Sequence, residues 1–133
     1  MLENRVALVV EDDAHCLMVI SKTLKELGVR FKRNTNGAHI LEQLHTMYPR
    51  PDFILLNIDL SDVDPYAVAH QIHTDPALRS IPVIGVGDFD SSTIKRMQSS
   101  GFAGLVGKPI LRRQMGDLLR QVLSGHKVWP ATA

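Results

Sequence analysis

Acidic and amide side chains follow several short apolar runs of the chain. Glu11 and Asp12 come directly after the run VALVV, and Asn57 closes the run FILLN. If these runs are parallel strands, their carboxyl ends meet at one edge of a sheet, and the three side chains converge there. Two carboxylates in one site repel each other unless a cation lies between them, and oxygen ligands of this kind favour Mg²⁺. The pattern therefore predicts a cation site.

Further polar residues follow the later runs. Asp59 lies two residues after Asn57, Asp88 follows the fourth run, and Lys108 follows the fifth. A lysine near the acids offers a second way to offset their repulsion. The acids also have a simpler interpretation, which applies best to Asp13: an acid before a helix caps it and stabilises its positively charged end.

The segments around these residues predict strands alternating with helices around a parallel sheet, an α/β fold. The first, third and fourth runs are almost continuously apolar, as strands covered on both faces should be, whereas the second alternates and should lie nearer an edge. The expected strands are Val6–Val10, Val29–Arg33, Phe53–Asn57, Pro82–Val86 and Phe102–Val106.

Apolar spacing predicts the first two helices. Gly28 ends the first helix, and Asn36 is expected to cap the second, which continues through Ile40, Leu41 and Leu44. Met18 is expected to fill the core, together with Met97 and Met115 from later helices. The inward face expected for the first helix consists of Ala14, Leu17, Met18, Ser21 and Leu24.

Cap signals predict the other three helices. Asp64 before Pro65 marks the start of the third helix, and Asp90 caps a fourth that ends at Gly101. The fifth helix should extend from Leu111 to Leu123. Its expected inward residues are Leu111, Met115, Leu118, Leu119 and Val122.

Composition limits the class of protein. A chain of 133 residues with 44% hydrophobic residues suits one domain. Its 15 basic and 14 acidic residues are mixed, which disfavours nucleic-acid binding. The sequence has no apolar run of the roughly 18 to 20 residues that a membrane span needs and no export signal, so we expect a cytoplasmic protein. We expect a domain over 1–125 and a tail or linker start over 126–133.

The blocks VVEDD, ILLNIDLSDVDP, IPVIGVGD and GFAGLVGKPI resemble, in order, those of the receiver domain of two-component response regulators. The resemblance extends from about Arg5 to Leu123. It implies a flavodoxin-like (βα)5 three-layer sandwich with a parallel sheet in the order 2-1-3-4-5.

The resemblance also implies roles for individual residues. Glu11 and Asp12 match the acidic pair that holds Mg²⁺, and Lys108 matches the lysine that contacts the phosphoryl group. Asn57 falls on the aspartate that accepts the phosphoryl group from a histidine kinase. The peptide bond between Lys108 and Pro109 is cis in this family.

Three departures from the family pattern change the expected chemistry. The amide oxygen of Asn57 is neutral and leaves no stable acyl phosphate. Gly87 replaces a Ser or Thr whose hydroxyl bonds the phosphoryl group, and Leu105 replaces a Tyr or Phe that changes position on activation. We therefore expect a naturally degenerate pseudo-receiver that is not an enzyme and requires no cofactor. Any Mg²⁺ site is expected to be weak, with Glu11 and Asp12 helped by Asn57 and the backbone of Asp59.

Two alternatives remain open. In the first, the chain is a phosphorylatable, Mg²⁺-dependent receiver; its acceptor is Asp59, or Asn57 is an engineered replacement of an acceptor Asp. In the second, it is a sensor of a small ligand that binds in the strand-end pocket. The resemblance implies that a kinase, an output domain or another signalling protein binds the face formed by the fourth helix, fifth strand and fifth helix. A homodimer could use the same face. The residues singled out there are Ile94, Met97, Leu105, Arg112 and Arg113.

Overall fold

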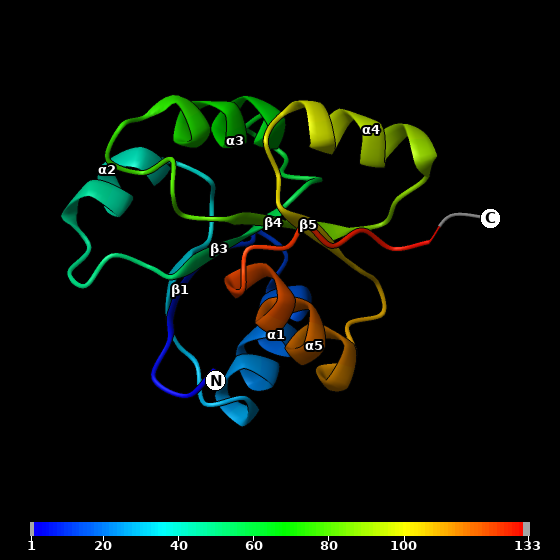
Figure 1. Cartoon of the computed structure of the whole chain (residues 1–133). Helices are drawn as coiled ribbons and strands as arrows, with labels where there is room; N and C mark the ends of the chain where they lie inside the picture. The colour runs from blue at the N-terminus through cyan, green and yellow to red at the C-terminus, as the bar shows by residue number, and fades with distance from the viewer. Residues whose placement is uncertain (1, 132–133) are drawn as a thin grey trace.

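The computed structural model describes residues 2–131 and shows a five-stranded parallel sheet between two helical layers (Figure 1). The strand order β2-β1-β3-β4-β5 confirms the predicted flavodoxin-like arrangement. In Figure 1, α2, α3 and α4 cover one face, and α1 and α5 cover the other. The elements are β1 (Val6–Val10), α1 (Ala14–Glu26), β2 (Arg30–Asn34), α2 (Ile40–Thr46), β3 (Phe53–Asn57), α3 (Pro65–Thr74), β4 (Val83–Gly87), α4 (Ser91–Ser99), β5 (Gly104–Gly107) and α5 (Arg112–Leu123).

The strand predictions are right for β1 and β3, whereas β2 and β4 begin one residue later and β5 two residues later. The backbone hydrogen bonds explain two of these shifts. The N–H of Val29 donates to Leu24 O, and the N–H of Phe102 donates to Met97 O, so both residues complete the preceding helix instead of starting a strand. The alternating run does form an edge strand, β2.

The face that α1 buries differs from the predicted one. Cys16, Ile20, Thr23 and Leu24 are buried, whereas Met18 is 60% exposed. The predicted inward face is confirmed at Leu24 and in part at Leu17 and Ser21, which are half-buried. It was wrong at Ala14 and Met18, which are exposed, so Met18 does not fill the core. The helix carries two overlapping stripes of apolar or small residues, and the sheet below it selects one of them. Met97 and Met115 are buried as predicted.

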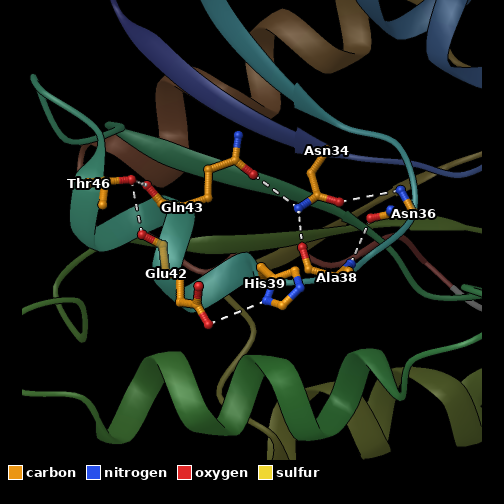
Figure 2. A network of polar contacts seen from close by, with 7 residues as sticks. All are labelled: Asn34, Asn36, Ala38, His39, Glu42, Gln43 and Thr46. Atoms are coloured by element: carbon orange, nitrogen blue, oxygen red, sulfur yellow. Dashed lines mark hydrogen bonds and ion pairs between the residues drawn. The ribbon is translucent and has the colours of Figure 1, made fainter.

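The loop between β2 and α2 is organised by the side chain of Asn34 (Figure 2). Its Oδ1 accepts from the N–H of Gly37 at 2.8 Å. Its Nδ2 donates to Ala38 O at 2.8 Å and to Gln43 Oε1 at 3.0 Å. Asn34 is buried, so these bonds satisfy an amide that would otherwise be costly in the interior.

The start of α2 departs from the prediction. The residue before the helix is His39, in a left-handed conformation with φ 56°, and its side chain makes no capping bond. The predicted cap was wrong: Asn36 Oδ1 accepts instead from the N–H of Ala38, within the loop. A local bond of this kind competes with helix formation and delays its start.

The cap predictions for α3 and α4 are confirmed. Asp64 accepts from the N–H of Tyr66 at 2.9 Å, and Asp90 accepts from the N–H of Thr93 at 2.8 Å. The Thr93 N–H and hydroxyl hold the pKa of Asp90 below its ordinary value. In α5 the four expected residues after Leu111 are buried, but Leu111 itself precedes the helix and is 49% exposed, so that part of the prediction was wrong.

The segment after α5 returns to the sheet. Val128 forms a parallel bridge with Gly104 of β5, and Trp129 packs against the core beneath α3 and α4. Figure 1 shows this red segment running beside β5. The peptide bond Lys108–Pro109 is cis, as the resemblance implied, and so is Tyr48–Pro49. Between residues 2 and 131, no helix has the length and apolar character that crossing a bilayer requires.

Candidate functional site

The acids and the amide singled out in the sequence meet at the carboxyl ends of β1 and β3. The two strands pair in register, with Val10 opposite Leu56, so the residues that follow them are neighbours. Glu11 is only 1% exposed and Asn57 only 5%. The parallel pairing thus gathers polar groups that are 46 positions apart in the sequence into a site that solvent barely reaches.

The amide of Asn57 bridges the two acids. Its Nδ2 donates to Glu11 Oε2 at 2.5 Å and to Asp12 Oδ1 at 3.3 Å. Its Oδ1 accepts from the N–H of Asp59 at 2.7 Å. Because this backbone donor needs an acceptor, the oxygen must face Asp59 and the nitrogen must face the acids.

Backbone N–H groups complete the cluster. Glu11 Oε2 also accepts from the N–H of Asp13 at 3.2 Å, and Asp12 Oδ2 accepts from the N–H of Ser61 at 3.0 Å. Asp13 Oδ2 accepts from the N–H of Cys16 and so caps α1, which confirms the simpler interpretation of that acid. Glu11 Oε1 is buried and has no hydrogen-bond partner.

Cys16 lies beneath the acids. Its burial, reinforced by the neighbouring Glu11 carboxylate, raises the pKa of the thiol to about 12. The thiol is therefore neutral at physiological pH. A neutral, buried thiol is a poor nucleophile, and Cys16 acts here as a small packed side chain.

The donor set does not suit Mg²⁺ as it is arranged. An amide can coordinate Mg²⁺ only through its oxygen, and the oxygen of Asn57 is bonded to the backbone on the other side. The N–H₂ group instead faces both carboxylates, where a cation would otherwise balance them. Within residues 2–131, no three His, Cys, Asp or Glu side chains gather in a way that could hold a metal ion.

The space above the end of β4 is filled mainly by apolar atoms. A Cβ added at Gly87 would lie 2.6 Å from Ile58 Cγ1 and 3.2 Å from Asp59 Oδ2. Two residues earlier on the same face of β4, a Cβ at Gly85 would meet Met97 Cε and Ile58 Cγ2. The side chains of Ile58 and Met97 thus occupy the space over β4, including the space that a hydroxyl-bearing residue at position 87 would need.

The end of β5 is similar. A Cβ at Gly107 would lie 2.6 Å from Phe89 Cε1, and Leu105 is 1% exposed. Lys108 is exposed, and among the described residues no ion pair or hydrogen bond includes its ammonium group. The structure therefore does not pair Lys108 with Glu11 or Asp12.

The residues expected on a partner-binding face differ in exposure. Ile94, Met97 and Leu105 are buried and unavailable to a partner. Arg112 is exposed and forms an ion pair with Glu26 of α1 at 2.8 Å, while Arg113 is exposed. Beside them, a groove of about 530 Å³ extends along β5 and α5 and is lined in part by Phe89, Leu111, Leu118 and Trp129.

Sequence reasoning missed the side chains that fill the β4–β5 half, Ile58, Phe89 and Met97. Glycine inside a strand often marks the close approach of another group. The glycines at 85, 87 and 107 were therefore available as a signal that neighbouring side chains lie against the backbone there. Only the fold shows which side chains these are.

Comparison with known proteins gives consistent results. The sequence matches the response regulator receiver domain family over residues 7–120. It is 30% identical over 104 residues to the polar-differentiation response regulator DivK of Brucella anthropi, covering 77% of this chain and 83% of that protein. It is also 30% identical over 105 residues to the sensor histidine kinase CheAY of Helicobacter pylori, covering 78% of this chain but only 13% of that kinase.

A solved structure has the same architecture. The signal receiver domain of a signal transduction histidine kinase from Syntrophus aciditrophicus superposes with a TM-score of 0.80 at 26% identity. The match covers 91% of each chain. The similarity therefore extends over most of the fold.

Proposed function

The chain belongs to the response regulator receiver domain family, and on this premise we propose that it is a pseudo-receiver. Receiver domains are signalling modules of two-component systems. In our proposal this one binds a protein partner without being phosphorylated at Asn57 and without requiring Mg²⁺.

The bridging amide of Asn57 is the observation that supports this function most strongly. Phosphoryl transfer needs an oxygen nucleophile in line with the donor and cations that neutralise the transferred group. Asn57 offers no carboxylate, and its amide nitrogen faces the two acids that would hold the cation. The hydrogen bonds that Asn57 makes within the cluster are therefore the same bonds that oppose metal binding.

The filled space above Gly87 supports the same conclusion independently. In the family a hydroxyl at this position follows the phosphoryl group, and here Ile58 lies too close for any side chain to be added without displacement. A conformational change that moves a side chain at position 87 toward a phosphoryl group would need space that Ile58 already occupies. The proposal thus depends on two separate features, one polar and one apolar.

Intact-mass measurement after incubation with acetyl phosphate and Mg²⁺ tests the phosphorylation claim. We expect no gain of mass in the natural chain. Asn57→Asp is the matched variant, because it restores the carboxylate and changes no other side chain, and we expect a phosphoryl adduct there alone. A gain of one phosphoryl group on the natural chain, even a transient one, would contradict the proposal. Loss of that adduct in Asp59→Ala would identify Asp59 as the acceptor.

The proposed partner surface is the exposed part of the face formed by α4, β5 and α5. Its partner would be a kinase, an output domain or another protein of two-component signalling. Arg113 is an exposed charge on this face that makes no ion pair within the described part of the chain, so it is available to an acidic group of a partner. Leu111 and the groove beside it add apolar surface.

Charge reversal tests this surface. Recovery of partners by the Arg113→Glu variant is expected to fall well below that of the natural chain. Lys22→Glu, on the exposed side of α1, is the matched control because it changes the net charge equally at a different face. Equal recovery by both variants would count against the α4–β5–α5 face.

A further inference from the structure

The two edges of the sheet differ in how they are protected from pairing with another chain. β2 is one edge, and three of its five residues are exposed and basic: Arg30, Lys32 and Arg33. Exposed charges on an edge strand oppose pairing with a like strand, because two copies would bring the same charges together. β2 is therefore protected by its own side chains.

β5, the opposite edge, has no such protection. Its four residues are Gly-Leu-Val-Gly, and none of them carries a charge. Such an edge presents unpaired N–H and C=O groups beside small or apolar side chains, which makes it a template for another strand. Unless something else covers it, β5 should be the edge at which this domain associates.

The segment 126–130 covers this edge. The N–H of Val128 donates to Ala103 O at 3.0 Å, and the N–H of Leu105 donates to Val128 O at 3.3 Å. The approach is close enough to require glycine: a Cβ at Gly104 would lie 2.7 Å from the carbonyl oxygen of Val128. The segment thus acts as a short sixth strand.

Apolar contacts anchor the covering segment on both sides of the sheet. Val128 packs against the core cluster beneath α1 and α5, and Trp129 packs against the cluster beneath α2, α3 and α4. Both side chains are only half-buried. Within the described residues, two backbone hydrogen bonds and two partly buried side chains hold the segment against the edge of the sheet.

We propose that segment 126–130 keeps this domain monomeric, and that β5, once uncovered, pairs with β5 of a second copy of the chain. Self-pairing satisfies the symmetry of a two-fold dimer, in which the same strand is contributed by each copy. No charge within β5 opposes the pairing, whereas the basic residues of β2 oppose it at the other edge. The inference goes beyond the proposed function and does not depend on the state of Asn57.

Two variants of the full chain test the proposal from opposite sides of the contact. Val128→Pro removes the N–H that bonds Ala103 O, and Gly104→Ala places a Cβ against the Val128 carbonyl. Lys127→Ala is the matched control, because Lys127 is exposed and makes no hydrogen bond within the described residues. Trp129 is the sole tryptophan of the chain, so its fluorescence reports release of the segment directly.

In both test variants we expect the Trp129 emission to shift to longer wavelength and sedimentation velocity to show a species of twice the monomer mass whose fraction rises with concentration. The natural chain and Lys127→Ala should remain monomeric. Shifted emission in a chain that stays monomeric at every concentration would overturn the self-pairing of β5. Unshifted emission in both variants would overturn the role of the two backbone bonds. If circular dichroism shows that one variant is unfolded, the result of the other variant tests the proposal. The outcome of the phosphorylation assay does not affect either result, because neither variant changes Asn57.

Discussion

The two halves of the strand-end pocket have departed from the family pattern in different ways. The half at β1 and β3 keeps its polar groups and bonds them to one another through the amide of Asn57. The half at β4 and β5 is filled mainly by the apolar side chains of Ile58 and Phe89, with Asp59 Oδ2 at its border. The contrast follows from the cost of burial: polar groups left in an interior must find partners, whereas vacated apolar space is filled by neighbouring side chains.

The largest effect is expected from Asn57→Asp, which breaks the polar half. It replaces a double donor with a third carboxylate, so without metal we expect the free energy of unfolding to fall by about 3 kcal/mol. Urea denaturation in EDTA measures this loss, and millimolar Mg²⁺ should recover much of it. Asn57→Ala is the control, with a smaller loss that Mg²⁺ does not recover. Equal stability of Asn57→Asp and the natural chain in EDTA would show that the amide does not bridge the acids.

The next effect is expected from Gly87→Ala, which tests the apolar half. Its Cβ meets Ile58 Cγ1, and overpacking of this kind costs about 2 kcal/mol. In a background of Ile58→Ala, which removes Cγ1, the same substitution should cost much less. A double-mutant cycle by chemical denaturation measures this coupling. Additive effects of the two substitutions would mean that Ile58 does not fill the space.

A smaller loss, about 1 kcal/mol, is expected from Gly107→Ala. The Cβ meets the edge of the Phe89 ring, and Phe89 is only half-buried, so the ring can turn toward solvent. The thermal midpoint of Gly107→Ala should therefore lie closer to that of the natural chain than the midpoint of Gly87→Ala. In a Phe89→Ala background the substitution should have no effect, and a persisting loss would contradict the assigned contact.

The smallest effect is expected from Lys108→Ala. The side chain is exposed and unpaired within the described residues, so the free energy of unfolding should change by less than about 0.5 kcal/mol. A loss of several kcal/mol in urea denaturation would mean that Lys108 neutralises the acids after all. Comparing Lys108→Ala with Asn57→Ala thus shows whether the Lys108 ammonium group or the Asn57 amide offsets the repulsion between Glu11 and Asp12.

Much of the site was predictable, and the parts that were not share a cause. The positions of Glu11, Asp12 and Asn57 follow from strand ends, which apolar runs mark in the sequence. Their bonding does not follow, because the direction of the Asn57 amide depends on the backbone N–H of Asp59. Likewise, nothing in the sequence around Gly87 shows that Ile58 turns toward it.

The helices give the same lesson. The caps Asp64 and Asp90 were predictable, because a cap bond joins residues two or three positions apart. The buried face of α1 was not, because the pattern contains two acceptable stripes and the sheet beneath decides between them. Asn36 shows that even a local signal fails when a competing local bond is available.

The sequence by itself determined the family, the order of the elements and the residues at the strand ends, since these depend on local propensity and on the period of apolar positions. Only the tertiary structure decided that an amide nitrogen faces the acids, that Ile58 fills the space above Gly87, and that segment 126–130 covers β5. Each of these depends on the direction of a side chain or backbone group toward a partner distant in sequence, and no local pattern encodes that direction.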